Sequence, residues 1–82
     1  MTINIKKLRH IIKIKKNLEK QPLSELSIWN QVYLHFTTIT EIWDEQCRNH
    51  NILPINNPDR NFYKSCSLIV HDKITKKINP KF

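Results

Sequence analysis

The sequence predicts an all-α protein, a small three-helix bundle that forms a single domain over residues 1–82. Apolar residues recur at spacings of three and four in three separate segments, which gathers them on one side of a helix turning about 100° per residue. Polar stretches that contain proline separate these segments, and glycine is absent. A chain of this length buries only about 60 to 65% of its unfolded surface, so we expect a thin core.

The first helix is expected at about residues 3–20, within a basic amphipathic N-terminal segment 1–21. Its apolar side carries Ile3, Leu8, Ile11, Ile14 and Leu18, with Ile5 and Ile12 on one flank. The opposite side is a cationic stripe, spaced by three and four residues: Lys6, Arg9, Lys13, Lys16 and Lys20. A β-strand over residues 2–16 is the alternative, but its alternation breaks between Leu8 and Ile11.

The second helix is expected at about residues 25–50. Gln21 and Pro22 interrupt the first helix, and Ser24 is a suitable N-cap. Leu23 and Ile28 are spaced to form a hydrophobic staple around that cap. The apolar pattern then runs for more than five turns through Leu26, Trp29, Val32, Tyr33, Phe36, Ile39, Trp43 and Cys47. Its aromatic residues are expected in the core.

The third helix is expected at about residues 58–78, after a polar loop over residues 49–58. Asn57 can cap it and Pro58 can occupy its first position, where a missing N–H costs nothing. Its apolar residues are Phe62, Tyr63, Cys66, Ile69, Val70, Ile74 and Ile78, and a short basic tail follows at 79–82. Because the connection is short, the second and third helices should form an antiparallel hairpin, with the isoleucine face of the first helix lying on it.

The net charge of +7 is distributed unevenly along the chain. Residues 1–22 carry seven bases and one acid, residues 23–57 one base and four acids, and residues 58–82 six bases and two acids. Isoleucine, asparagine and lysine supply 33 of the 82 residues, a composition typical of an AT-rich genome, but the regular spacing of the stripe is harder to attribute to codon usage. The stripe therefore predicts an anionic partner.

Nucleic acid is the leading candidate partner. The stripe, supported by Lys73, Lys76 and Lys77, is expected to hold a phosphate backbone from two sides if the chain ends lie together. Lysines outnumber arginines eleven to three, which favours backbone contact over base reading. The sequence thus predicts a non-catalytic accessory or structural protein on RNA or DNA, such as a ribonucleoprotein subunit.

Two other kinds of partner fit the sequence. A small subunit of a protein assembly is the second interpretation, with Leu34 and Ile42 as interface residues because they interrupt a polar side of the second helix. A membrane-surface anchor is the third, since anionic lipid selects amphipathic helices with lysines on the polar face. That helix lacks an interfacial Trp or Phe.

Enzyme activity, a cofactor and a small-molecule substrate are not expected, because no nucleophile, acid and base set or glycine-rich loop is present. A zinc site is disfavoured because Cys66 and His71 diverge by about 140° on a helix. A disulfide from Cys66 to Cys47 is disfavoured as well. In the predicted hairpin, the residue of the second helix that faces Cys66 lies nearer Ile42 than Cys47. The acidic residues Glu41, Asp44 and Glu45 are expected to pair with Arg48 on a solvated face. His10, at the edge of the stripe, is expected either to add a contact there or to be solvated, and His35 to lie at the surface.

Two cysteines are too few for a disulfide framework, and no signal-peptide pattern is evident. The longest uninterrupted apolar run, Leu68 to Val70, is far shorter than the roughly 20 residues that cross a bilayer. We expect a reducing compartment, the cytoplasm or an organelle matrix, for a chain that is neither secreted nor transmembrane.

Overall fold

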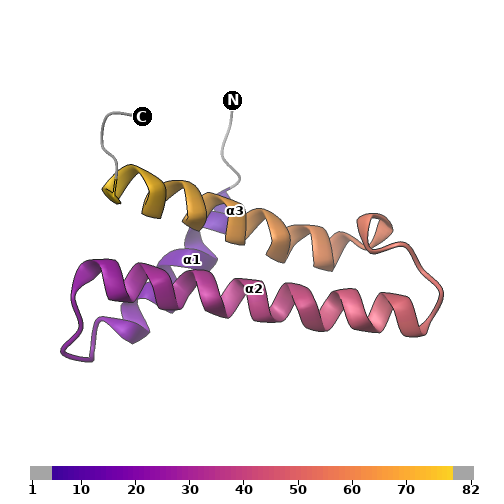
Figure 1. Ribbon diagram of the computed structural model, residues 1–82, viewed down its shortest axis with the longest axis horizontal. Helices are drawn as coiled ribbons and strands as arrows, with labels where there is room; N and C mark the ends of the chain where they lie inside the picture. The colour runs from indigo at the N-terminus through magenta and orange to yellow at the C-terminus, as the bar shows by residue number, and fades with distance from the viewer. Residues whose placement is uncertain (1–4, 79–82) are drawn as a thin grey trace.

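The computed structural model describes residues 5–78, and these form three α-helices and one turn of 3-10 helix. The elements are α1 (Ile5–Leu18), α2 (Glu25–Asn49), η1 (Pro54–Asn56) and α3 (Pro58–Ile78). Figure 1 shows α2 and α3 side by side as an antiparallel hairpin, with α1 behind them. The predicted all-α three-helix fold is confirmed. The expected start of the first helix at residues 3–4 and the basic tail at 79–82 lie outside the described residues.

The helix caps that the sequence indicates are present. The Ser24 side chain accepts a hydrogen bond from the Ser27 backbone N–H at 3.2 Å and begins α2. Asn57 Oδ1 accepts from the Arg60 N–H at 3.0 Å, and Pro58 is the first residue of α3. Both caps satisfy N–H groups that have no partner within the first turn of a helix.

The connection between α2 and α3 is more ordered than its polar composition indicates. Asn51 adopts a φ of 57°, a left-handed conformation that Asn tolerates better than most residues. The η1 turn follows, and Asn61 Nδ2 donates a hydrogen bond to the Ile55 carbonyl at 2.7 Å. This turn leaves the side chains of Leu53 and Ile55 exposed at the tip of the hairpin.

The core lies where all three helices meet. Phe36 and Val32 of α2 are fully enclosed, as are Val70 and Cys66 of α3, and α1 contributes Ile11. The rest of the buried cluster is Ile28, Trp29 and Ile74. Most of the predicted apolar faces therefore form the core, although Ile5, Ile12, Leu26 and Ile78 remain exposed. Trp43, an aromatic residue expected in the core, is only half-buried and lies outside this cluster, because α1 does not extend over that part of α2.

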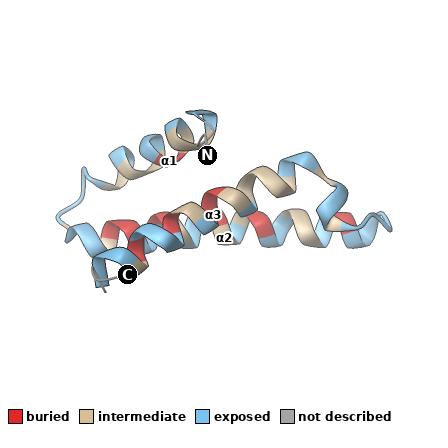
Figure 2. Ribbon diagram, turned by 90° about the horizontal axis from the view of Figure 1, so that it is seen from above, coloured by how far each residue is buried: buried red, intermediate tan, exposed pale blue. Residues whose placement is uncertain are grey.

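The first helix covers only half of the hairpin. Figures 1 and 2 both show α1 over the end that holds the start of α2 and the end of α3. With a rise of 1.5 Å per residue, the 14 residues of α1 span about 21 Å, whereas the 25 residues of α2 span about 37 Å. The hairpin half near η1 is thus a two-helix layer without a third helix on it.

Candidate nucleic-acid interface

The cationic stripe lies on the solvent side of α1. Ile11 at the centre of the opposite face is 1% exposed, because it packs on α2 and α3. Stripe residues are rotated by roughly half a turn from that face, so they point away from the hairpin. All five are exposed: Lys6, Arg9, Lys13 and Lys16 on the helix, and Lys20 in the turn that follows it.

Most of this stripe carries charge that no carboxylate in the described part of the chain neutralises. Among residues 5–78, no carboxylate lies within ion-pair distance of Arg9, Lys13, Lys16 or Lys20. Lys6, at the start of α1, borders a shallow groove together with Asp59 and Phe62 of α3. The positive potential of the outer face of α1 is therefore available to an external anion.

A neighbouring lysine of α1 has a different role. Lys15 lies at the edge of the packed face, 3.5 Å from the Glu19 carboxylate and 3.8 Å from that of Glu25 at the start of α2. Its Nζ also sits 4.9 Å from the centre of the Trp29 ring. Lys15 thus joins α1 to α2, and the helix separates structural lysines from outward-facing ones.

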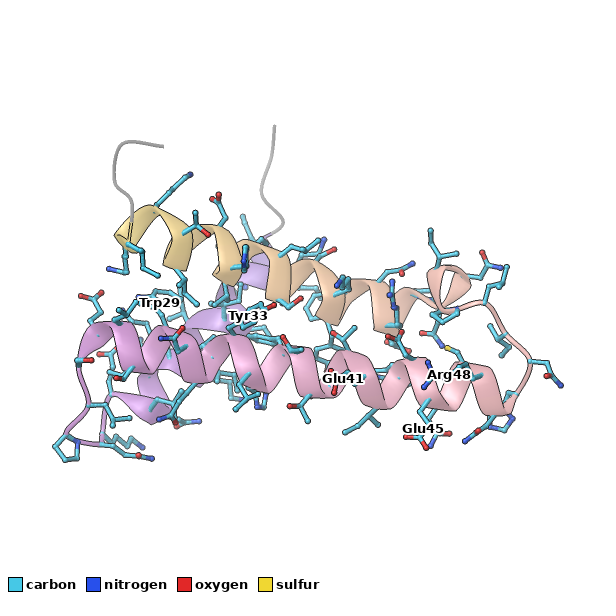
Figure 3. All side chains as sticks on the ribbon, in the orientation of Figure 1. Trp29, Tyr33, Glu41, Glu45 and Arg48 are labelled. Atoms are coloured by element: carbon cyan, nitrogen blue, oxygen red, sulfur yellow. The ribbon has the colours of Figure 1, made fainter. Side chains whose placement is uncertain are left out.

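The predicted C-terminal lysines reach the same end of the bundle. Lys77 Nζ is 3.2 Å from Glu25, and Lys73 Nζ is 5.6 Å from the Trp29 ring centre. Trp29 is the labelled ring at this end in Figure 3. Bases from α1 and α3 therefore converge around one indole and one carboxylate. Lys76, in contrast, pairs with Asp72 of its own helix at 3.0 Å.

The pKa of Glu25 is lowered from its ordinary value by this arrangement. The hydrogen bond and charge of Lys77 contribute most, followed by the Trp29 indole and the charge of Lys15. The indole Nε1 is buried and has no acceptor within hydrogen-bond distance among the described residues. Its N–H dipole nevertheless favours the ionised form of the nearby Glu25 carboxylate. Lys15 of α1 and Lys77 of α3 both pair with Glu25 of α2, so their charges help to hold the three helices together. The outer stripe is therefore the stronger candidate for binding an external anion.

Histidine placement differs from the sequence-based expectation at one position. His10 is not simply solvated at the edge of the stripe, because its ring lies 5.5 Å from that of Phe62, 5.8 Å from Tyr63 and 6.1 Å from Phe36. It anchors α1 to the other two helices. His35 lies on the exposed side of α2, and partial burial lowers its pKa, with the charge of His10 adding to the effect.

The acidic residues of α2 also pair differently from the expectation. Asp44 Oδ1 accepts from Arg60 Nε of α3 at 2.7 Å, so this carboxylate links the hairpin rather than pairing with Arg48. Over residues 5–78, Arg48 forms no ion pair with Glu41 or Glu45. The sequence pattern missed Arg60 because its partner lies sixteen residues away.

The two cysteines lie buried on the two helices of the hairpin. Cys47 and Cys66 are both buried free thiols. Burial raises the pKa of the Cys66 thiol to about 11, against a smaller opposing effect of Lys7. Within the described part of the chain, no group of three or more His, Cys, Asp or Glu side chains is arranged to hold a metal ion.

The two predicted interface residues line different grooves. Leu34 borders an open groove between α1 and α2, together with Ile14 and Leu18. Ile42 borders a groove of about 430 Å³ at the far half of the hairpin, which we call the distal groove. Both side chains are exposed, at 62% and 55%. They do not form one continuous contact surface with each other.

Comparison with protein-family models, curated protein sequences and solved structures found no match to this chain. Across residues 5–78, no helix has both the length and the apolar character needed to cross a membrane.

Proposed function

We propose that this chain is a non-catalytic nucleic-acid-binding protein that contacts the phosphate backbone of RNA or DNA through the outer face of α1. The observation that carries the proposal is the exposed row Arg9, Lys13 and Lys16, which no carboxylate of residues 5–78 neutralises. A row of fixed cations on a rigid helix suits a polyanion with regularly spaced charges.

The nature of the exposed residues favours backbone contact over base recognition. Trp29 and Phe36 are buried, so neither offers an open face on which an unpaired base could stack. Lysine, a point charge without a fixed donor geometry, predominates in the stripe. Binding is therefore expected to depend strongly on salt and weakly on sequence.

The test measures binding to duplex DNA, structured RNA and single strands at several salt concentrations. Five phosphate contacts predict that log K falls with log salt at a slope of about −4 to −5. Reversing Lys13 and Lys16 together to glutamate should abolish binding while helical content is retained. Binding that survives this double reversal would show that the stripe is not the site.

A matched pair of single variants separates local from overall charge. Lys13→Glu and Lys64→Glu each lower the net charge from +7 to +5 at an exposed helical position. Only Lys13→Glu should weaken binding strongly and reduce the magnitude of the salt slope by about 1. Equal losses in both variants would show that net charge, rather than the α1 surface, attracts the ligand.

A second candidate function, an accessory subunit of a protein assembly, is favoured by the exposed Ile42, Leu53 and Ile55 side chains. It predicts poor cooperative unfolding of the isolated chain and no affinity for nucleic acid at low salt. A membrane-surface helix would also need exposed apolar residues, and Ile5 and Ile12 beside the stripe are exposed. Binding to vesicles of anionic lipid, compared with vesicles of neutral lipid, tests this interpretation.

A further inference from the structure

A shallow groove lies between α1 and α3, beside the cationic stripe. Its volume is about 400 Å³, within the range of sites that hold small planar groups. Three of the residues that line it carry rings, one from α1 and two from α3. We call it the aromatic groove, and its lining residues are Lys6, His10, Pro58, Asp59, Phe62 and Tyr63.

The three rings of the aromatic groove are held rigidly by their contacts with one another. The Phe62 ring centre lies 5.5 Å from that of His10 and 5.3 Å from that of Tyr63, with the planes nearly perpendicular in both pairs. All three residues are half-buried, so they pack on the bundle on one side and border the groove on the other. Unlike the enclosed Trp29 and Phe36, they offer aromatic surface to an external planar group.

The cationic stripe passes along the edge of this groove. His10 follows Lys6 by four residues and precedes Lys13 by three, so these side chains are neighbours on one side of α1. Lys6 itself lines the groove. Lys13 is exposed, and no carboxylate of residues 5–78 lies within ion-pair distance of it. A nucleic-acid strand whose phosphates follow the stripe therefore runs past the mouth of the groove.

The chemistry of the lining favours a base over a phosphate inside the groove. The carboxylate of Asp59 would repel a phosphate, whereas it can accept a hydrogen bond from a ring N–H of a base. Pro58, Phe62 and Tyr63 supply apolar surface to the remainder of the ring. Stacking of this kind tolerates every base, because each has a π-face, so the contact agrees with weak dependence on sequence.

We propose that the aromatic groove accepts one unpaired base of a strand whose phosphates lie on the cationic stripe. This inference rests on the proposed function and narrows its ligand to single strands and the unpaired segments of structured RNA, whose bases are free to leave the stack. The bases of a duplex are already paired and stacked, so a duplex would contact the stripe alone.

The test compares two single strands that differ only in their bases, because duplex and single strand also differ in charge density. One is a labelled oligothymidine, and the other is an abasic strand with the same number of phosphates. Fluorescence anisotropy at constant salt measures both affinities for the wild-type protein. Oligothymidine should bind about tenfold more tightly, the advantage typical of one stacked base.

Two variants locate that advantage on the protein. Phe62→Leu keeps an apolar side chain but removes the ring, so it should abolish the preference for oligothymidine and leave the affinity for the abasic strand unchanged. Trp43→Leu is the matched control, because Trp43 is also a half-buried aromatic residue of the hairpin but lines the distal groove. It should retain the full preference. Lys13→Glu should weaken both strands equally. Circular dichroism checks that each variant folds.

The failure of this inference is distinguishable from failure of the proposed function. Equal affinity of the wild type for both strands, or a preference that survives Phe62→Leu, would overturn the base site while leaving backbone binding by the stripe in place. Equal loss of the preference in Trp43→Leu would also overturn it. Absence of binding to either strand at low salt would overturn the proposed function, and the base site with it. The wild-type comparison decides the matter even if Phe62→Leu does not fold.

Discussion

Replacing Phe36 by alanine is expected to remove a large share of the stability of this bundle. Phe36 is fully buried, and its ring lies 6.1 Å from His10 of α1 and 6.4 Å from Tyr63 of α3. It is therefore packed between elements from all three helices. Removing a fully buried phenylalanine side chain typically costs about 3 to 5 kcal/mol, through lost burial and the cavity left behind.

The loss expected for Phe36→Ala is large relative to the total free energy of unfolding. At about 0.05 to 0.15 kcal/mol per residue, a chain of this length has a free energy of unfolding of about 4 to 12 kcal/mol. A loss of about 4 kcal/mol would leave a protein at the lower end of that range about half unfolded. Stability at the upper end would still fall enough to move the urea midpoint clearly.

Urea unfolding followed by far-UV circular dichroism measures this loss. Phe62→Ala is the matched control, because the Phe62 ring also contacts His10, at 5.5 Å, but is only half-buried. Its cost should be about half that of Phe36→Ala. A cost below about 1 kcal/mol for Phe36→Ala, or equal costs for both variants, would refute the assignment of Phe36 to the centre of the core.

Three further predictions follow from caps, charges and thiols. Ser24→Ala should lower the free energy of unfolding by about 1 kcal/mol in urea titration, while Ser24→Asp should retain most of it; no effect would contradict the cap. Because Lys77 and Lys15 depress the pKa of Glu25 in the folded state, their stabilising effect is present above its ordinary value of 4.5 and is lost as pH falls through the folded value. Glu25→Gln should thus destabilise the bundle at neutral pH but not in strong acid, and an equal effect in both would contradict this. Burial that raises the pKa of Cys66 to about 11 should make its thiol unreactive toward iodoacetamide at pH 8 until urea is added, and rapid labelling in the native state would contradict that burial.

Local signals in the sequence were sufficient to locate the helices. Ser24, Asn57 and Pro58 supply chemistry that acts within one helical turn, and the structure uses each of them as the sequence indicates. The apolar spacing of α2 likewise identifies its buried face. Such features depend on residues three or four positions apart, so a linear reading captures them.

Contacts between residues far apart in the sequence could not be predicted from the apolar spacing. The Arg60 to Asp44 ion pair depends on the register between α2 and α3, and the packing of His10 on Phe62 depends on where α1 crosses the hairpin. Apolar spacing defines which face of a helix is buried but not where along its partner it lies. Helix length carried part of this information, because a first helix of about 18 residues is too short to cover a second of about 26.

The candidate site shows the same division. Exposure of Arg9, Lys13 and Lys16 follows from their opposition to Ile11 on one helix, and the structure places them on the outer face. The gathering of Lys15 and Lys77 around Glu25 depends on the tertiary fold, and spacing alone gave no signal for it.

The unequal helix lengths account for the uneven distribution of charge and apolar surface over the molecule. Because α1 is short, its cations are concentrated at one half of the molecule, and the apolar distal groove is left at the other half, where residues 38–64 carry four acids and three bases, a net charge of −1. The cationic surface proposed for the phosphate backbone and the uncovered distal groove therefore lie at different ends of the bundle, and a substitution at one surface should leave the other intact.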